Sequence, residues 1–482
     1  MPNLGELIPS DCLVEGAVDF TITGLTPDSR AVERGFVFAA IRGTQVDGAK
    51  FIPKAIEQGA IAILLDEETP CDAQVTIIRS PNPRKSLAEM AASFFPKQPS
   101  VIAAVTGTAG KSSVVSFLRQ IWEHAGFEAA SIGTVGIVSS KSSTYGGLTT
   151  PDAVKLHETI QNLAEEGVTH LAFEASSHGL DQYRLDGVKV THAAFTNLGR
   201  DHMDYHPDID DYMRAKMRLF RDLLPVGAPA VIDENAPFGA AAQTQIEDAR
   251  RVAWGVGKTG TKIRLMDVAR SGFGQNLVLA IDGVDHSVFL PLLGDFQVSN
   301  ALTAAGLALA SGVEVEAIIE ALADLKGEKG RLEYVGQNNA GALFFIDYAH
   351  KVEALQNILE ALRPYAENQL IVVFGAGGDR DNGKRPLMGK AACEGSDLVI
   401  VTDDNPRSED PALIRGQILV EVPDALEIGD REEAINEAVK RAKSGDVVVI
   451  AGKGHETGQI VGDKILPFSD HEVLARALND EG

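Results

Sequence analysis

Residues 101–113 read VIAAVTGTAGKSS, an apolar run that leads directly into a loop with two glycines. In residues 114–125, apolar positions recur at the spacing of one face of a helix. Glycines let such a loop turn its backbone N–H groups toward phosphate oxygens, and the start of a helix adds a partial positive charge. Lys111 can reach the outer phosphates, and the Ser112 hydroxyl can bind Mg²⁺. The stretch therefore predicts a strand, a phosphate-binding loop and a helix that hold a nucleoside triphosphate.

The loop is a shortened variant of the usual phosphate-binding pattern. Thr106 precedes Gly107, so the first glycine lies closer to Gly110 than is usual. The alternative is a plain glycine turn between a buried strand and a helix, with Lys111 in solvent. The apolar run before the loop and the amphipathic pattern after it favour the phosphate-binding interpretation.

The length and charge of the chain limit the classes of protein to which it can belong. Its 482 residues exceed what one core holds and indicate several domains. A formal net charge of −24 argues against nucleic-acid binding, which needs a basic surface. Neither a run of membrane-spanning length nor a signal peptide is evident. With three widely separated cysteines, these features predict a cytoplasmic protein with free thiols and no membrane partner.

Two polar stretches divide the chain into three predicted domains. Residues 94–100 carry two prolines, and residues 326–330 are polar and glycine-rich. The expected domains are 1–98, 99–328 and 329–482. The expected fold class is α/β, with a small mixed α/β N-terminal domain, a central parallel-sheet domain like those of P-loop ATPases and a C-terminal Rossmann-like domain. The runs interpreted as strands are 36–40, 101–105, 171–173, 193–195, 230–232, 344–346, 370–374, 398–401 and 447–450, and 52–65 is interpreted as a helix followed by a strand.

Three apolar runs of the C-terminal domain end in dense polar motifs. These motifs, at residues 375–381, 402–407 and 451–456, read GAGGDRD, TDDNPR and AGKGHE. Ligands of open α/β sheets bind outside the carboxyl ends of the strands, so we expect Arg380, Arg407 and Glu456 around one crevice. Arginines suit carboxylates and an acidic group suits an ammonium, which is the charge pattern of an amino-acid pocket. Turn chemistry explains one such motif, but three in one domain favour a binding site.

Acidic and imidazole side chains follow two of the predicted strands in the central domain. Glu174 directly follows one apolar run, and Asp201 and His202 come shortly after the run that ends at Phe195. The other polar residues of this second stretch are Asn197, Asp204 and His206. Carboxylates and imidazoles at neighbouring strand ends can hold a hard divalent cation beside phosphates. The spacing is not that of a zinc site, so Mg²⁺ is the expected metal, and a structural His202 with Asp201 as a helix cap is the alternative.

Taken together, these motifs resemble those of the Mur ligase family over nearly the whole chain. The similar stretches are 28–30, 47–48, 106–113, 149–151, 174–180, 196–206, 330–331, 347–350, 377–381 and 452–456. Within the family, the chain is most similar to ligases that add the third residue of the peptidoglycan stem peptide. The resemblance implies that the D-glutamyl γ-carboxylate of a UDP-N-acetylmuramoyl dipeptide takes the γ-phosphoryl group of ATP. An incoming amine then attacks the acyl phosphate to form an amide.

The resemblance also implies roles for individual residues around ATP and Mg²⁺. Catalytic roles fall on Lys111, Glu174, His202 and Lys216. The implied ATP contacts are Gly107, Thr108, Ala109, Gly110, Lys111, Ser112, Ser113, Asn300, Arg331 and Asp347. The implied metal ligands are Ser112, Glu174, His202 and Lys216, the last as a carbamate. Considered alone, a lysine such as Lys216 on a helix is a solvated charge.

Two further sets of residues follow from the same resemblance. The implied contacts of the UDP-muramoyl dipeptide are Pro27, Ser29, Thr44, Gln45, Val46, Thr149, Thr150, Ser177, Gln182 and Arg184. The implied contacts of meso-2,6-diaminopimelate are Arg380, Asp404, Asn405, Pro406, Arg407, Gly452 and Glu456. Lysine-adding relatives lack the arginine that stands here at position 407. This cation would receive the second carboxylate of diaminopimelate, which is costly to bury unpaired.

The chain departs from the family pattern at a few positions. Ala109 stands where asparagine is usual, Ser112 where threonine is usual, and Lys351-Val352 where Thr-Pro is common. Arg200 occupies a position at which a small polar residue is frequent. None of these changes removes a group that the implied mechanism requires.

Three alternatives remain open on the sequence alone. They are the same ligation with L-lysine, a related ligase such as folylpolyglutamate synthase or the D-alanyl-D-alanine-adding enzyme, and a nucleotide-dependent switch without ligation. A switch needs no amino-acid pocket, so the charged motifs of the C-terminal domain argue against it. The expected partners are small molecules, the expected state is a monomer, and the C-terminal domain is expected to rotate onto the central domain to assemble the site.

Overall fold

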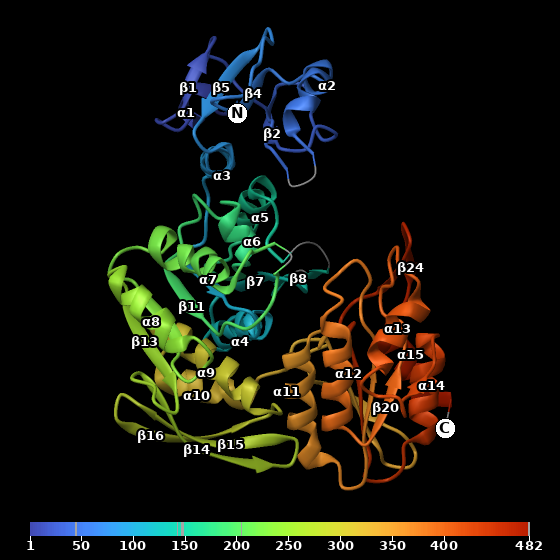
Figure 1. Ribbon diagram of the computed structural model, residues 1–482. Coiled ribbons are helices and arrows are strands. Elements are labelled where there is room, and N and C mark those ends of the chain that lie inside the picture. Colours follow the sequence, from blue (N-terminus) through green and yellow to red (C-terminus); the bar gives the residue numbers. More distant parts are fainter. Residues whose placement is uncertain (44–45, 142, 146–148, 204, 481–482) are drawn as a thin grey trace.

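A computed structural model describes residues 1–43, 46–141, 143–145, 149–203 and 205–480, and it shows three α/β bodies in chain order (Figure 1). The N-terminal body lies at the top of the view, the central body below it, and the C-terminal body beside the central one. Each body has its own main sheet. The strands of these sheets lie within the predicted segments 1–98, 99–328 and 329–482, respectively.

The N-terminal body is a five-stranded sheet in the order β1-β5-β4-β3-β2. β2 to β5 pair in parallel and β1 is antiparallel to β5, which agrees with a mixed α/β domain. Its strands are β1 (Leu13–Glu15), β2 (Gly24–Thr26), β3 (Phe36–Ala39), β4 (Ala62–Asp66) and β5 (Thr76–Ser80). Its helices are α1 (Leu4–Leu7), the 3₁₀ turn η1 (Gly48–Phe51), α2 (Ile52–Glu57) and α3 (Pro83–Phe94). The last of these leads down into the central body (Figure 1).

The central body has an eleven-stranded sheet in the order β16-β15-β14-β13-β12-β11-β6-β10-β7-β8-β9. Its middle, from β13 to β7, is parallel, as the alternation of strands and helices predicts. These parallel strands are β6 (Val101–Thr106), β7 (Ala129–Gly133), β10 (His170–Glu174), β11 (His192–Phe195), β12 (Pro229–Asp233) and β13 (Val252–Gly257). The helices are α4 (Lys111–His124), α5 (Ala153–Glu165), α6 (Ser177–Asp181), α7 (Ile209–Arg218), the π turn η2 (Leu219–Leu223), α8 (Gly239–Asp248), α9 (Asp295–Ala310) and α10 (Val315–Ala323).

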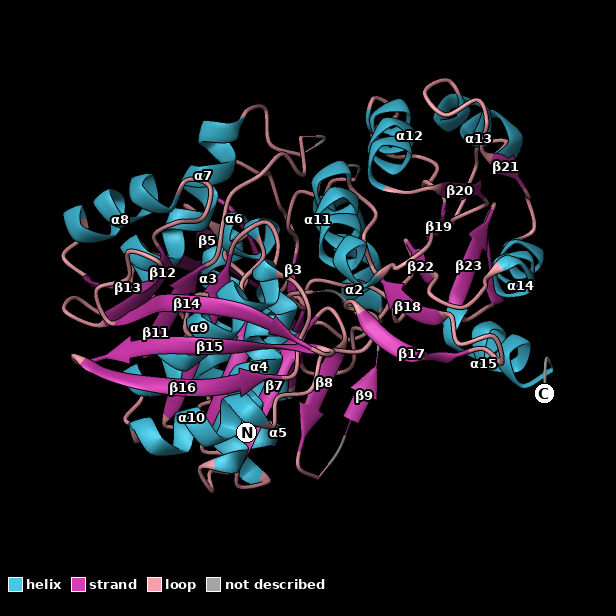
Figure 2. Ribbon diagram, turned by 90° about the horizontal axis from the view of Figure 1, so that it is seen from below, coloured by secondary structure: helices cyan, strands magenta, loops and turns pink. Residues whose placement is uncertain are grey.

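Antiparallel strands extend both ends of this sheet, a feature that the sequence patterns did not predict. At one end β14 (Ile263–Ser271), β15 (Gly274–Ile281) and β16 (Val284–Leu290) form a meander, which lies in front of the central body in Figure 2. At the other end β8 (Gly136–Ser139) and β9 (Ser143–Tyr145) continue from β7. Tight connections rather than helices join these strands, so a rule based on strand–helix alternation passes over them.

Two apolar clusters cover the two faces of the central sheet. Val105 and Val231 pack with α4, α9 and α10 on one face. Ala104 and Ile232 pack with α5, α7 and α8 on the other. Because successive strand residues point to opposite faces, a strand buried on both sides becomes a continuous apolar run. This is why the apolar run at 101–105 predicts a strand.

The C-terminal body repeats this design with six strands in the order β17-β18-β22-β19-β20-β21. β17 is antiparallel and the rest are parallel. The strands are β17 (Glu333–Gln337), β18 (Leu343–Asp347), β19 (Leu370–Phe374), β20 (Leu398–Val401), β21 (Leu426–Glu427) and β22 (Val447–Ala451), with a separate hairpin of β23 (Gly458–Val461) and β24 (Lys464–Pro467). The helices are α11 (Val352–Leu362), the 3₁₀ turn η3 (Arg363–Tyr365), α12 (Lys384–Gly395), α13 (Pro411–Leu419), α14 (Arg431–Arg441) and α15 (Asp470–Asp480). α11, α12 and α13 cover one face of the sheet, and α14 and α15 cover the other.

A helix that crosses a membrane must be both long and apolar. Within the described residues, no helix is both long and apolar enough to span a membrane.

Candidate active site

The predicted phosphate-binding loop joins β6 to α4 in the middle of the central sheet. Gly107 and Gly110 have φ values of +148° and +85°, which residues with a Cβ rarely adopt. A Cβ at residue 107 would overlap the hydroxyl of Thr196, and one at residue 110 would overlap the side-chain oxygen of Asn300. Both glycines are therefore required by the backbone conformation and by the closeness of neighbouring side chains.

Lys111 is the first residue of α4, and its side chain turns back over the loop. Its Nζ donates to the carbonyl oxygens of Gly107 at 2.8 Å and Thr108 at 3.0 Å. Burial lowers the pKa of Lys111 to about 8, and the carboxylate of Glu174 opposes this shift. The side chain is thus a cation at neutral pH, placed where a phosphate would meet the loop.

Glu174 ends β10, the parallel neighbour of β6, so its carboxylate reaches the same edge of the sheet as the loop. Its Oε1 accepts hydrogen bonds from Ser112 Oγ at 2.9 Å and from the backbone N–H of Thr134 at 2.7 Å. Its Oε2 accepts a bond from Thr134 Oγ1 at 3.2 Å. The carboxylate is buried and fixed beside the hydroxyl that follows Lys111.

Lys216, on α7, is one of the largest fully buried side chains in the described part of the chain. Its Nζ donates to the carbonyl oxygen of Gly107 at 2.8 Å and lies 4.3 Å from the centre of the Tyr212 ring. Burial lowers the pKa of Lys216 well below its ordinary value, and the charge of Lys111 lowers it further. The structure therefore excludes the solvated helix lysine that the sequence left open.

His202 lies in the loop after β11, with its Nε2 at 3.1 Å from Asp201 Oδ2. Burial lowers the pKa of His202 to about 4, although Asp201 opposes this. Asp201 also accepts a hydrogen bond from Lys351, at the start of α11 in the C-terminal body. Burial alone would raise the pKa of Asp201, but Lys351 and His202 together hold it below its usual range. The ring of His178 lies 4.8 Å from that of His202.

The predicted metal-binding residues meet only in part. Ser112 and Glu174 are in direct contact, and Lys216 joins Lys111 at the Gly107 carbonyl, whereas His202 pairs with Asp201. Across the residues that the structure describes, no three His, Cys, Asp or Glu side chains form a group that could hold a metal ion. Asp204, which the sequence placed in this set, lies outside the described residues.

The three predicted nucleotide contacts outside the loop come from α9 and from the start of the C-terminal body. Asn300 lies directly against Gly110. Arg331 reaches across to Ser112, with Nη2 at 3.4 Å from its Oγ, and its guanidinium lies 4.5 Å from the centre of the Tyr348 ring. Asp347 is held by the backbone N–H groups of Leu332 at 2.5 Å and Ala349 at 2.7 Å, and burial raises the pKa of Asp347 to about 6.

Five residues predicted to contact the UDP-muramoyl dipeptide surround the start of α6. Thr150 Oγ1 donates to the Glu174 carbonyl at 2.9 Å, and Arg184 donates to the Thr150 carbonyl at 2.7 Å and to Gln182 Oε1 at 2.7 Å. Thr149 Oγ1 lies 3.0 Å from Thr134 Oγ1, which itself contacts Glu174. The buried Ser177 hydroxyl has no hydrogen-bond partner within the described residues. These groups thus form one polar surface next to the carboxylate of Glu174.

The predicted dipeptide contacts of the N-terminal body are less completely seen. Ser29 is buried and Val46 is exposed. Pro27 is half-buried and follows β2 directly. Thr44 and Gln45 lie outside the described residues.

In the C-terminal body, the loops after β19, β20 and β22 converge, as their motifs predict. Arg407 Nη1 donates to the carbonyls of Gly378 at 2.8 Å and Asn405 at 3.3 Å. Asn405 Nδ2 donates to Glu456 Oε2 at 2.9 Å. A Cβ at Gly377 would lie 2.8 Å from Arg407 Nη1 and 3.9 Å from Arg380 Cγ, so both arginines border this glycine.

The other residues predicted for this crevice are buried or closely packed. Asp404, Asn405 and Pro406 are buried. Gly452 has a φ of +119°, and a Cβ there would overlap the Asp404 carboxylate. The crevice thus combines a half-buried arginine, an exposed arginine and two carboxylates, which is a surface for a group that carries both signs of charge.

Several residues of the site were not predicted from their motifs. Thr134 follows β7 and caps the Glu174 carboxylate with two hydrogen bonds. Lys351 was noted only as a departure from a family pattern, and its pairing with Asp201 in another body has no local signal. Lys453 stands within a recognised motif, but a lysine in a polar loop is ordinarily solvated, whereas this one is fully buried.

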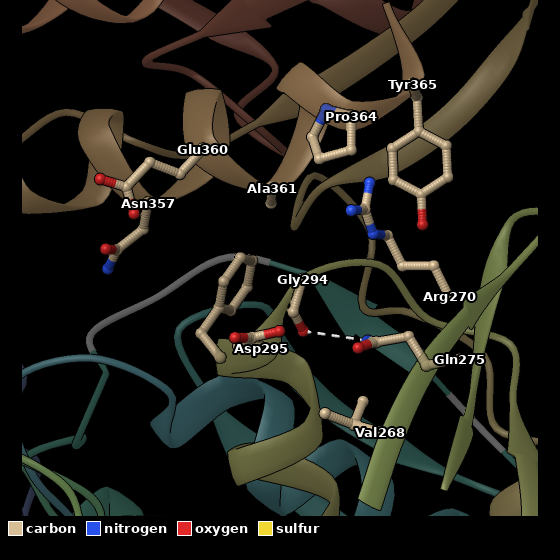
Figure 3. A pocket seen from close by; sticks show the side chains of 11 residues that line it. Val268, Arg270, Gln275, Gly294, Asp295, Asn357, Glu360, Ala361, Pro364 and Tyr365 are labelled. Atoms are coloured by element: carbon tan, nitrogen blue, oxygen red, sulfur yellow. Dashed lines mark hydrogen bonds between the residues drawn. The ribbon is translucent and has the colours of Figure 1, made fainter.

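A separate cavity of about 390 Å³ lies between the central and C-terminal bodies (Figure 3). Arg270, Gln275 and Asp295 line it from the central body, and Glu360 and Tyr365 line it from the C-terminal body. The predicted site residues do not line it. The cavity shows that the two bodies are incompletely packed against each other at this side.

Comparison with known protein families gives a match in each of the three bodies. Residues 21–95 match "Mur ligase family, catalytic domain", residues 105–308 match "Mur ligase middle domain", and residues 330–454 match "Mur ligase, glutamate ligase domain". Two curated relatives carry the name UDP-N-acetylmuramoyl-L-alanyl-D-glutamate--2,6-diaminopimelate ligase. The one from Bradyrhizobium diazoefficiens is 53% identical over 481 residues, which are 99% of each chain. The one from Brucella melitensis is 54% identical over 474 residues, which are 98% of this chain and 96% of the relative.

Solved structures give the same picture at the level of the fold. A structure of a UDP-N-acetylmuramoyl-L-alanyl-D-glutamate--2,6-diaminopimelate ligase superposes with a TM-score of 0.72 and 32% identity, and it covers 100% of this chain and 99% of that one. A Mycobacterium tuberculosis folylpolyglutamate synthase superposes with a TM-score of 0.63 over 77% of this chain and 92% of its own. At 19% identity, this second likeness speaks for the shared fold alone.

Proposed function

The chain belongs to the Mur ligase family, and we propose that it is the ATP-dependent ligase that joins meso-2,6-diaminopimelate to UDP-N-acetylmuramoyl-L-alanyl-D-glutamate. The reaction forms an amide with the D-glutamyl γ-carboxylate, releases ADP and phosphate, and belongs to the synthesis of the peptidoglycan precursor. The observation that carries the choice of amino acid is the crevice in which Arg407 and Glu456 flank Asn405. Relatives about half identical over their whole length carry the name of this reaction.

The triphosphate of ATP would lie on the loop from Gly107 to Ser113. Within the described residues, no side chain caps the start of α4, so its first N–H groups favour anions, and Lys111 adds a cation beside them. Asn300, Arg331 and Asp347 surround the same loop from α9 and the C-terminal body, and we assign them to the nucleoside part. The nucleotide would therefore join the two bodies.

The donor set beside the loop fits Mg²⁺. Ser112 Oγ and the Glu174 carboxylate are hard oxygen ligands already in contact at 2.9 Å. We assign His202 and Lys216 to the same centre, the lysine as a carbamate. A neutral amine is the form that adds CO₂, and burial, which lowers the pKa of Lys216, favours this form. When bound, Mg²⁺ would neutralise charge on the phosphoryl group that is transferred.

The UDP-muramoyl dipeptide would extend from the N-terminal body to the polar surface at α6. We assign Pro27, Ser29, Thr44, Gln45 and Val46 to its UDP end. Thr149, Thr150, Ser177, Gln182 and Arg184 would hold its peptide end. The buried Ser177 hydroxyl lacks a hydrogen-bond partner within the described residues, so it is free to bond to the dipeptide.

The reaction itself requires an activated carboxylate, because a carboxylate anion is a poor electrophile. A γ-carboxylate oxygen attacks the γ-phosphorus of ATP, the bond to the bridging oxygen breaks, and ADP leaves. Lys111 stabilises the charge that develops on the transferring group. The amine of diaminopimelate then attacks the acyl carbon, phosphate leaves, and the amine proton is lost to give the amide. Closure of the two bodies around the site would keep water away from the acyl phosphate.

The amino-acid crevice would select the substrate by its distal end. Arg407 carries a guanidinium that matches a carboxylate, and Glu456 and Asp404 offer negative charge for an ammonium. Arg380 stands exposed at the rim beside Gly377. L-Lysine would leave the guanidinium without its carboxylate, so it is the poorer substrate in this proposal.

An ADP-release assay with a panel of amino acids tests the proposal. We expect release only when ATP, the UDP-muramoyl dipeptide and meso-diaminopimelate are all present, with L-lysine, D-alanyl-D-alanine and L-glutamate as comparison acceptors. Release with L-lysine in place of diaminopimelate would contradict the assigned amino acid. ATP hydrolysis that is unaffected by either co-substrate would favour a nucleotide-dependent switch instead.

The expectations on assembly and location belong to the same proposal. We expect a monomeric enzyme of the cytoplasm, where its nucleotide-linked substrates and ATP are found. Light scattering of the purified protein, with and without ATP, checks the monomer directly.

A further inference from the structure

Lys453 lies beneath the amino-acid crevice with its side chain fully buried. Its Nζ lies 3.1 Å from Asn405 Oδ1, 3.4 Å from Glu456 Oε2 and 3.5 Å from Asp404 Oδ1. A buried ammonium group is costly unless acceptors surround it. Here all three acceptors belong to residues that we assign to the amino-acid substrate. Lys453 itself is covered and has no surface to offer to that substrate.

These contacts join two loops that start from different strands. Asp404 and Asn405 follow β20, Lys453 and Glu456 follow β22, and β19 lies between these strands in the sheet. The loops come so close at Gly452 that a Cβ there would overlap the Asp404 carboxylate. Lys453 therefore lies where the two halves of the crevice meet.

The side-chain amide of Asn405 is oriented by this lysine. Its Oδ1 accepts from Lys453 Nζ and from the backbone N–H of Ile460 at 2.9 Å. Because two donors hold the oxygen, the Nδ2 group faces Glu456 and donates to its Oε2 at 2.9 Å. Asn405 also has a φ of +47°, a left-handed conformation that surrounding contacts must maintain. Tyr348 donates to the other carboxylate oxygen of Glu456 at 3.4 Å.

The balance of buried charge points to the same role. Another buried cation nearby, Arg431, makes two hydrogen bonds of 2.8 Å to Asp470, which neutralises it. Lys453 Nζ lies 3.5 Å from Asp404 Oδ1 and 3.4 Å from Glu456 Oε2. Lys453 balances one of the two carboxylates that it contacts, which leaves the other for an incoming ammonium group. Without Lys453, the two carboxylates lose the cation that they share and repel each other, which would displace Glu456 from its position.

We propose that Lys453 is a positioning residue for the amino-acid substrate, which acts by orienting Asn405 and Glu456 toward the distal ammonium group of a diamino acid. The inference deepens the proposed function and rests on it. It assigns no contact between Lys453 and the substrate. Substitution of Lys453 should therefore weaken the affinity for the amino acid, and this loss should depend on the presence of Glu456.

Steady-state kinetics of the full chain test the first of these points. With Lys453→Met, we expect the KM for meso-diaminopimelate to rise by about tenfold or more, since a charged hydrogen-bond network is lost. The KM values for ATP and the UDP-muramoyl dipeptide should stay within about twofold, as is usual for distant sites. Lys440→Met, at an exposed lysine on α14 of the same body, is the matched control and should leave all three KM values unchanged.

A double-mutant cycle separates positioning from simple structural support. Lys453→Met should have a much smaller effect on the KM for diaminopimelate in a Glu456→Gln background than in the wild type, because the lysine acts through that carboxylate. Equal effects in both backgrounds would overturn the proposal. So would an unchanged KM for diaminopimelate in Lys453→Met, or an equal rise of all three KM values.

Two further measurements, the folding of each variant and the activity of the wild type, distinguish a failure of the positioning role from misfolding and from a failure of the proposed function. Thermal unfolding is measured for each variant, and if Lys453→Met does not fold, Lys453→Gln carries the same tests. The glutamine keeps a donor for Asn405 and removes the charge. Absence of ADP release by the wild type with diaminopimelate would overturn the proposed function. Normal wild-type release with an unaffected Lys453 variant would overturn the positioning role alone.

Discussion

Lys111 and Lys216 share one acceptor, since both ammonium nitrogens lie 2.8 Å from the carbonyl oxygen of Gly107. Two cations this close repel each other, and burial adds to the cost of charging them. Burial lowers the pKa of Lys111 to about 8, and burial together with the charge of Lys111 lowers the pKa of Lys216 well below its ordinary value. At the scale of single residues, burial thus lowers the pKa of both lysines, and for Lys216 this favours the neutral amine to which CO₂ adds.

A pH dependence of ATP binding follows from Lys111. Below a pKa of about 8 the side chain is charged and attracts the phosphates, and above it the charge is lost. We expect the Kd for ATP to rise roughly fivefold between pH 8 and pH 9, as linkage to one proton requires. Calorimetric titration over this range measures it, and Lys111→Met should bind weakly with little dependence on pH. A Kd that falls as the pH rises would contradict this role.

Arg407 is the residue on which amino-acid selection is proposed to depend. Arg407→Ala should lower kcat/KM for meso-diaminopimelate by about a hundredfold, because a carboxylate is left without its cation. The KM for ATP should be unaffected. The ADP-release assay measures both, with Arg476→Ala on the exposed side of α15 as control. Wild-type selectivity in Arg407→Ala would exclude this arginine as the selecting group.

At the scale of elements, the polar residues of both larger bodies gather at the carboxyl ends of parallel strands. In the central body these are β6, β10 and β11, and in the C-terminal body they are β19, β20 and β22. Loops from neighbouring strands must pack closely there to bring their side chains together. Gly378, in the loop after β19, shows how closely, because a Cβ at this residue would overlap the carbonyl oxygen of Pro406.

Gly378→Ala should therefore disturb the amino-acid crevice while leaving the nucleotide site intact. The added methyl group pushes the loop after β20 away and displaces Arg407, whose guanidinium bonds to the Gly378 carbonyl. We expect the KM for diaminopimelate to rise about tenfold with the KM for ATP unchanged, since clashes of this kind cost about 1–3 kcal/mol. A change of both KM values in parallel would argue against a local effect.

Gly416→Ala is the matched control for that substitution. Gly416 lies within α13, and a Cβ there meets no atom within 4 Å among the described residues. Alanine should leave the kinetics unchanged and raise the free energy of unfolding by about 1 kcal/mol, because it favours the helix. Thermal unfolding and the ADP-release assay check the two expectations.

At the scale of the whole molecule, side chains of the C-terminal body reach the central body on the side of the phosphate-binding loop. Arg331 contacts Ser112, and Lys351 pairs with Asp201. The ring of His455 also forms a hydrogen bond with the backbone of Thr134 in the central body. The cavity of about 390 Å³ between the same two bodies shows looser packing elsewhere. A gap of this kind beside the contacts is compatible with a hinged pair of domains that closes on its substrates.

Lys351→Met should shift this arrangement toward a more open form. Loss of a partly buried ion pair is worth about 1 kcal/mol, roughly a fivefold change in population. Small-angle scattering of the ligand-free variant should show a larger radius of gyration than the wild type, and a non-hydrolysable ATP analogue with the UDP-muramoyl dipeptide should compact both. Lys390→Met, on the exposed face of α12, is the control. Identical scattering of all three proteins would show that the ion pair does not hold the bodies together.

The sequence by itself determined the features that depend on neighbouring residues. The strand, glycine loop and helix of 101–124 followed from apolar periodicity and from glycine conformation, which are local properties. The convergence of Arg407 and Glu456 also followed, because parallel strands end at one edge of a sheet. The family resemblance placed further residues at their motifs. The antiparallel strands β8, β9 and β14–β16 were missed, since alternation with helices was the signal used.

Only the tertiary structure decided which distant side chains meet and in what state of charge. Lys216 stands 109 residues from Gly107, and Lys453 stands 48 residues from Asn405, yet each pair is hydrogen-bonded. Neither contact has a local pattern, because it depends on the order of strands in a sheet. Burial then sets the chemistry, since it determines whether a lysine is a solvated cation, a neutral amine or a buried counter-charge. The phosphate-binding loop could be predicted from the sequence. The contacts of Lys216 beside that loop and of Lys453 beside the amino-acid crevice could not, because they depend on how the sheets assemble.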